Sequence, residues 1–230
     1  AARSCPVVTQ HQFDPTVELV GGDESLRDAF HGGIVFQDHV LDLVVERFKG
    51  RLVDLRPLFA EPSATQVDAC LAALGEGVDV VVGGLLPVDL VGHRSGRADL
   101  WVRGPDRADG RPGYYPVECK KRRVLERRPL PKDAHPTYST LASVLPGKAV
   151  SVDGVVFRYS SRELDLIQMA HYWRQLETLE FSADGAPRAG VIGTDHVHEL
   201  GHDPVIAWVE LAEPTIRTFS RTAPDGWALR

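Results

Sequence analysis

The sequence predicts an α/β fold in which a mixed central β-sheet is flanked by helices. Segments with helical periodicity stand early and late in the chain, and segments typical of strands lie between and after them. No internal repeat is present. With 230 residues, of which 43% are hydrophobic and 25% charged, the chain has a globular composition and can bury one core. We therefore expect one domain spanning residues 1–230.

The first helix is expected over 36–48. Leu41, Val44 and Phe48 recur at helical spacing and form one apolar stripe. Gln37 heads the same stripe, so the pattern places a polar side chain among residues that face the interior.

A second helix is expected over 63–74, because this segment starts with a serine and stops before a glycine. Strand-like segments follow at 78–86, 96–102 and 114–119. The last two are separated by residues 104–113, which are rich in Gly, Pro and Asp and predict a hairpin loop.

Residues 120–154 contain four prolines and little periodicity, which predicts an irregular excursion from the domain. A long helix is expected next, over 161–181. Ser160 and Glu163 have the spacing of a capping box at its start. Further short strands are expected at 189–192, 204–211 and 215–220.

Three residues on the predicted hairpin suggest chemistry. Glu118 and Lys120 are two apart in a strand and so point to the same side, and pairing across the loop would bring Asp99 alongside Glu118. Two carboxylates and an ammonium suit a hard divalent cation such as Mg²⁺ or Mn²⁺. Such a site can activate water and neutralise charge on a scissile phosphate.

The long helix carries a second signal. Gln168 and Tyr172 are four apart and share one face. The same stripe is expected to contain Leu164, Leu176 and Leu179. Gln168 would therefore point inward, which costs free energy unless a buried partner accepts or donates a hydrogen bond. Inward polar residues on separate elements are easier to explain by one shared site.

In this order, Gly-Arg-Ala-Asp99, Glu118-Cys-Lys120 and Gln168-x-x-x-Tyr172 resemble the PD-(D/E)XK nuclease superfamily, and more narrowly its RecB-like branch. The resemblance covers roughly residues 5–220. It implies a restriction-endonuclease-like core and metal-dependent DNA cleavage, exonuclease-like, on single strands or DNA ends in repair or recombination. It also implies that Asp99 and Glu118 bind the metal, that Lys120 is catalytic, and that Gln168 and Tyr172 support the site and the DNA.

The chain departs from this pattern on the first helix. Many members carry a His or Glu there that also touches the metal, whereas the matching position here is Gln37, beside Asp38 and His39. Which of the three, if any, would join the metal stays open. This departure leaves a second hypothesis, a catalytically inactive DNA-binding subunit of a repair complex.

Cysteine usage bears on cofactors and on the cellular compartment. The three cysteines, Cys5, Cys70 and Cys119, are widely spaced and form no CxxC motif. Relatives with an iron–sulfur cluster use four cysteines, so no cluster is expected here. The pattern favours a reducing, cytoplasmic compartment.

A rival motif is His198-Glu199-Leu200-Gly201-His202, which matches the H-E-x-x-H string of zinc peptidases. That chemistry requires a helix, so that both histidines face one metal ion. Glycines and an Asp-Pro pair bracket the string, and strand-like segments lie on both sides. We therefore expect a loop, and a zinc peptidase is the least favoured hypothesis.

The formal net charge of −6 argues, as an average, against a protein that coats nucleic acid. Residues 119–132, however, contain seven basic residues against one acidic residue, a local charge of +6 next to the proposed site. We expect this run to bind the DNA backbone. Its expected DNA-binding residues are Lys121, Arg122, Arg123, Arg127 and Arg128. No apolar segment is long enough to span a membrane, and nothing in the sequence indicates a helicase or repair partner.

Overall fold

The computed structural model describes residue 16 and residues 24–129 and 136–212. The chain divides into two units, residues 1–35 and 36–230. The second unit contains all the strands of the described residues and the candidate site. Whether residues 1–35 belong to the same domain stays a prediction.

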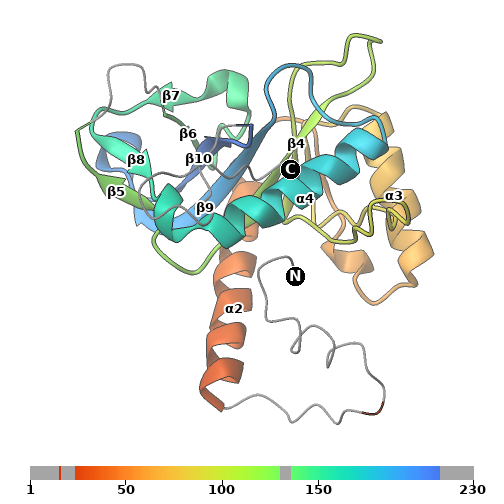
Figure 1. Ribbon diagram of the computed structural model, residues 1–230, viewed down its shortest axis with the longest axis horizontal. Helices are drawn as coiled ribbons and strands as arrows, with labels where there is room; N and C mark the ends of the chain where they lie inside the picture. The colour runs from red at the N-terminus through yellow and green to blue at the C-terminus, as the bar shows by residue number, and fades with distance from the viewer. Residues whose placement is uncertain (1–15, 17–23, 130–135, 213–230) are drawn as a thin grey trace. The chain divides into compact units, whose positions relative to one another are not determined.

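The architecture is an α/β fold built on one eight-stranded sheet (Figure 1). In spatial order the strands are β1 (Leu52–Asp54), β2 (Val80–Val82), β3 (Leu100–Arg103), β4 (Tyr114–Cys119), β9 (Arg188–His196), β10 (Pro204–Glu210), β6 (Thr137–Thr140) and β7 (Val150–Ser151). Strand β1 runs parallel to β2, and β4 runs parallel to β9, whereas the other neighbours are antiparallel. The predicted mixed central sheet is confirmed.

The described residues form three α-helices: α2 (Glu24–Arg47), α3 (Ser63–Gly75) and α4 (Glu163–Thr178). Helix α4 crosses the face of β4 and β9, where Leu166, Met169 and Leu176 are fully buried (Figure 1). In α2, Leu41 and Val44 are fully buried, as their spacing predicted.

The centre of the sheet is apolar, which fixes the position of the strands that carry the site. All three valines of β2 and all six residues of β4 are buried, as expected for strands covered on both faces. Tyr114 anchors the start of β4, because its hydroxyl shares its proton between the carbonyls of Leu74, in the last turn of α3, and Val78, just before β2.

Residues 120–154, expected as an irregular excursion, contain three short strands in their described part. Strand β5 (Leu125–Arg127) pairs with β8 (Val155–Phe157) in a separate two-stranded sheet, and β6 and β7 extend the central sheet. The described prolines of this segment, Pro129, Pro136 and Pro146, lie outside the strands, where no ladder hydrogen bond is lost.

Several predicted boundaries also differ. Helix α4 begins at Glu163 with Arg162 at its N-cap and no side-chain cap, so the expected capping box is wrong. A 3₁₀ turn over Tyr159–Ser161 occupies the chain there instead. The helix ends at Thr178, because Glu180 adopts a left-handed conformation with φ of 60°. Leu164 is 69% exposed, so it does not belong to the buried stripe. The predicted strand at 215–220 lies outside the described residues.

Candidate active site

Asp99 and Glu118 lie side by side at one end of the paired central strands β3 and β4. Strands β3 and β4 pair with Leu100 opposite Val117, so the same register places Asp99 opposite Glu118 one step further along. The backbone N–H of Cys119 donates to Asp99 Oδ2 over 2.6 Å. Both carboxyl groups are buried, with Asp99 6% and Glu118 8% exposed.

Lys120 and Gln168 complete the cluster. Lys120 Nζ donates to Glu118 Oε1 over 3.1 Å and to Gln168 Oε1 over 2.7 Å. Gln168 Nε2 donates to Glu118 Oε1 and to the Tyr172 hydroxyl, each over 2.8 Å. The five residues that the sequence analysis assigned to one site therefore lie together where β3, β4 and α4 meet. They are Asp99, Glu118, Lys120, Gln168 and Tyr172.

The local electrostatics of this cluster are unfavourable for two ionised carboxylates. Burial, reinforced by the charge of Glu118, raises the pKa of Asp99 to about 8. Burial also raises the pKa of Glu118, although the ammonium of Lys120 and the hydrogen bond from Gln168 oppose this effect. One lysine balances one of the two negative charges, so a further cation would stabilise the ionised pair.

The donor set fits a hard divalent cation. Glu118 Oε2 is buried, and no hydrogen-bond donor reaches it from the described part of the chain. An unpaired carboxylate oxygen next to a second carboxylate is the kind of oxygen ligand that Mg²⁺ and Mn²⁺ prefer. A buried carboxylate oxygen left without a partner otherwise costs free energy.

Among the side chains described on the first helix, no acidic or imidazole group joins this pair as a third ligand. Within residues 24–129 and 136–212, no three His, Cys, Asp or Glu side chains converge as a metal-binding group. Asp38 and His39, expected as alternative ligands, are exposed, and Gln37 is half-buried. Among the described side chains, a metal here would therefore rely mainly on Asp99 and Glu118.

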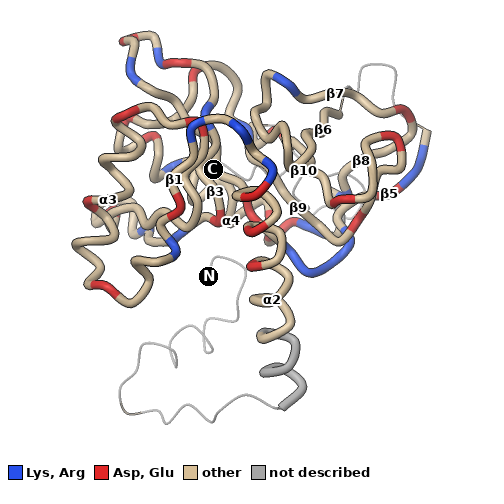
Figure 2. Tube along the Cα trace, turned by 180° about the vertical axis from the view of Figure 1, so that it is seen from behind, with Lys and Arg blue, Asp and Glu red and all other residues tan. Residues whose placement is uncertain are grey.

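The basic run leaves the site along the segment that joins β4 to β5, where Figure 2 shows successive Lys and Arg in blue. Acidic side chains distant in sequence pair with several of these residues. Arg122 pairs with the buried Asp165, and Arg123 Nε donates to the buried Asp195 over 3.0 Å. Sequence reasoning missed both aspartates, because their partners lie 43 and 72 residues away.

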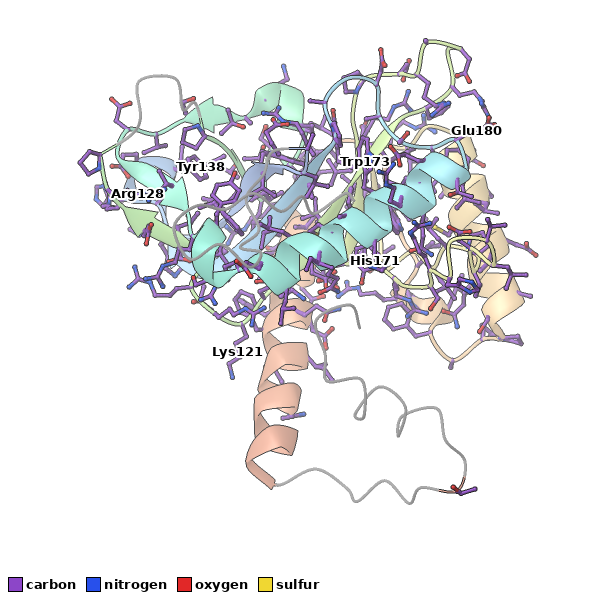
Figure 3. The ribbon with its side chains drawn as sticks, viewed as in Figure 1. Lys121, Arg128, Tyr138, His171, Trp173 and Glu180 are labelled. Carbon is purple, nitrogen blue, oxygen red and sulfur yellow. The ribbon has the colours of Figure 1, made fainter. Side chains whose placement is uncertain are left out.

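Further along the run, Arg127 Nη2 donates to both carboxylate oxygens of Glu199, each over 3.0 Å, and Arg128 pairs with Glu126 over 3.6 Å. These ion pairs offset part of the positive charge of the run, so its net charge in the folded protein is lower than the local sequence suggests. Lys121 is exposed, and Figure 3 shows its side chain extending away from the strands. Lys132 lies outside the described residues.

The H-E-x-x-H string lies in the connection between β9 and β10, as predicted. His198–Leu200 form one 3₁₀ turn, and Gly201 follows with φ of 114°. Strand β10 begins at Pro204, so the two histidines do not share the face of an α-helix.

Comparisons with protein-family models, with curated proteins and with solved structures found no match to this chain. Cys70 and Cys119 are buried free thiols, and Cys5 lies outside the described residues. No helix in the described ranges has the length and apolar character needed to cross a membrane.

Proposed function

We propose that the protein is a Mg²⁺- or Mn²⁺-dependent DNA nuclease of the PD-(D/E)XK superfamily, in its RecB-like branch. The observation that carries the proposal is the unpaired, buried Oε2 of Glu118 beside Asp99, with Lys120 fixed next to both. The arrangement of β3, β4, α4 and β9, with β9 parallel to β4, supports a restriction-endonuclease-like core.

The side chains of the cluster have complementary roles in phosphodiester hydrolysis. A divalent ion held by Asp99 and Glu118 would activate a water molecule and offset charge on the scissile phosphate. Lys120 has three N–H donors, of which two bind Glu118 and Gln168. The third can donate to the attacking water or to a phosphate oxygen in the transition state.

Gln168 acts on the reaction through Lys120 and Glu118. Its amide oxygen accepts from the ammonium while its amide nitrogen donates to the carboxylate, so it fixes the relative position of the two groups. The Tyr172 hydroxyl accepts a hydrogen bond from the same amide nitrogen and limits its orientation. Such preorganisation reduces the reorganisation needed in the transition state.

The substrate follows from the resemblance and from the adjoining basic run. We propose single-stranded DNA or DNA ends, cut in exonuclease fashion during repair or recombination. Lys121 is exposed, and the Arg123 and Arg127 side chains are 71% and 60% exposed despite their acidic partners. Both arginines can still donate to a phosphate oxygen, because a guanidinium carries five N–H donors, and Lys121 can donate through its ammonium.

The test is a cleavage assay with end-labelled single- and double-stranded DNA in Mn²⁺, Mg²⁺ or EDTA. Wild type should cut with either metal and not in EDTA, and Glu118→Gln should abolish cleavage. Glu126→Gln is the matched control, because Glu126 lies on β5 and pairs with Arg128 and Arg158 outside the cluster. Absence of cleavage by wild type, or equal activity of the two variants, overturns the proposal.

A second candidate function is DNA binding without cleavage. It is favoured by the exposure of Asp38 and His39. The described residues then offer two acidic metal ligands, whereas many members of the superfamily have a further His or Glu ligand on the first helix. Retained DNA binding by wild type with no metal-dependent product in the same assay would favour this candidate.

A further inference from the structure

A small hollow lies at the N-terminal end of α4, beside the candidate active site. Its volume is about 190 Å³, and its lining includes Arg122, Arg162 and Asp165. Asp165 pairs with Arg122. One turn further along α4, Gln168 accepts from Lys120, which stands two residues before Arg122. Three residues advance an α-helix by about 4.5 Å, so the hollow lies next to the cluster that contains Lys120.

The hollow offers several hydrogen-bond donors. Helix α4 has no side-chain cap, and within the described ranges no acceptor binds the backbone N–H of Leu164 or of Asp165. The guanidinium of Arg162 donates to the carbonyls of Arg123 and Ser161. No carboxylate of the described residues forms an ion pair with Arg162. These groups can donate further hydrogen bonds to a ligand.

One buried acceptor also lines the hollow. Asp165 is 2% exposed, and its Oδ1 pairs with Arg122. Its other carboxylate oxygen, Oδ2, is buried, and no donor reaches it from the described part of the chain. A buried carboxylate oxygen without a partner costs free energy unless a ligand supplies the donor. The hollow therefore suits a group that accepts several hydrogen bonds and donates one.

A phosphate monoester has this combination of acceptors and donor. It carries three acceptor oxygens, and its second pKa of about 6 leaves part of the population with one P–OH proton at neutral pH. An internal phosphodiester of DNA has no such proton to donate to Asp165. Burial, and after it the charge of Arg122, lowers the pKa of Arg162, so a bound anion would stabilise this guanidinium and a cation would not.

Net charge does not attract the ligand to this hollow. Its lining has two basic and two acidic side chains, Arg122, Arg162, Glu163 and Asp165. Recognition would therefore depend on the pattern of donors and acceptors, which distinguishes a monoester from the diesters of a DNA strand.

We propose that the hollow at the N-terminal end of α4 binds the terminal phosphate of a DNA strand, whose P–OH group donates to Asp165 Oδ2. Arg162 and the backbone N–H groups of Leu164 and Asp165 donate to the remaining phosphate oxygens. The inference rests on the proposed nuclease function and deepens it, because it assigns phosphorylated DNA ends as the substrate class. It places the end of the strand one helical turn from the contact between Gln168 and Lys120.

A first experiment measures binding of inorganic phosphate and of sulfate at neutral pH in EDTA, by isothermal titration calorimetry. Sulfate has the same shape but carries no proton at this pH. Wild type should bind phosphate about tenfold more tightly than sulfate. Asp165→Asn should remove this preference, because an amide nitrogen in place of Oδ2 donates instead of accepting. Equal affinity of wild type for the two ions overturns the proposal.

A second experiment compares single-stranded oligonucleotides of one sequence with an internal fluorophore. They carry a 5′-phosphate, a 3′-phosphate, or hydroxyls at both ends, and anisotropy in EDTA measures binding without metal-dependent cleavage. One phosphorylated end should bind wild type about tenfold more tightly than the hydroxyl ends, and Arg162→Gln should lose this difference. The preferred end assigns the strand polarity. Three equal affinities overturn the proposal, and binding of inorganic phosphate alone overturns a DNA end as its source.

Arg111→Gln is the matched control. Arg111 also forms ion pairs, but with Asp109 and with Glu180, which lies just beyond the C-terminal end of α4. Its affinities should equal those of wild type, and equal thermal unfolding midpoints should verify the fold of each variant. Because Arg162 is half-buried rather than buried, Arg162→Gln decides the question if Asp165→Asn does not fold. If wild type cuts no DNA, the proposed nuclease function fails, whereas binding in EDTA still decides whether the hollow holds a terminal phosphate.

Discussion

Neutralising Asp99 should stabilise the folded protein at alkaline pH when no divalent cation is present. The ordinary pKa of this carboxyl is 3.8, and burial next to Glu118 raises it to about 8. The folded state therefore holds a proton that the unfolded chain releases more readily. The stability linked to Asp99 is fully present below pH 3.8 and is lost as the pH rises through about 8.

The magnitude follows from the two pKa values. A tenfold change in proton affinity corresponds to about 1.4 kcal/mol, so the raised pKa of Asp99 lowers the free energy of unfolding by at most about 5 kcal/mol at pH 8 and about 2 kcal/mol at pH 5. Structural relaxation reduces such costs, and we expect Asp99→Asn to add about 2 to 4 kcal/mol of stability at pH 8.

The assay is urea unfolding of wild type and Asp99→Asn in EDTA, at pH 8 and pH 5. The stabilising effect of the substitution should be several times larger at pH 8. Adding Mn²⁺ at a hundredfold excess over its dissociation constant should stabilise wild type by about 3 kcal/mol and leave the variant nearly unchanged. A variant that is less stable than wild type at pH 8, or an effect independent of pH, would refute this reasoning.

Three further predictions concern other parts of the structure. Asp195→Ala should lower the free energy of unfolding by about 3 kcal/mol, because it leaves two backbone N–H groups and the Arg123 guanidinium without their acceptor, as measured by urea denaturation. Gly84→Ala should lower the free energy of unfolding by about 1 to 3 kcal/mol, because the added Cβ would lie 2.8 Å from the buried ring of Trp101. Gly147→Ala is the control, because that glycine has open space around it, and its melting temperature should be unchanged. Gln168→Leu should lower the rate of single-turnover cleavage by about 10- to 100-fold, because Gln168 positions Lys120 and Glu118. The DNA affinity, measured by fluorescence anisotropy, should change little. An equal loss of rate and affinity would contradict this positioning role.

The arrangement of the candidate site could be predicted from sequence because short-range rules decide most of it. Strand alternation places Glu118 and Lys120 on one side, and the hairpin loop determines which residue lies opposite Glu118. Helical spacing places Gln168 and Tyr172 on one face of α4. The inward direction of Gln168 followed from its place in an apolar stripe, and the cost of burying an amide without a partner indicated that it binds a neighbouring polar group.

Long-range pairing could not be predicted in this way. The basic run looked unopposed because Asp165 and Asp195, which pair with Arg122 and Arg123, are distant in sequence. The strands within 120–154 were missed because each is short and prolines separate them. Leu164 was assigned to the core by its spacing alone, but it lies in the first turn of α4 and is largely exposed.

The most direct test of the central claim compares two adjacent lysines. Lys120 donates to Glu118 and Gln168 inside the cluster, whereas Lys121 is exposed. Single-turnover cleavage of labelled single-stranded DNA in Mn²⁺ should fall by about 100-fold or more in Lys120→Met and by no more than about threefold in Lys121→Met. Equal rates for the two variants, or Mn²⁺-dependent cleavage by Lys120→Met at the wild-type rate, would contradict the account.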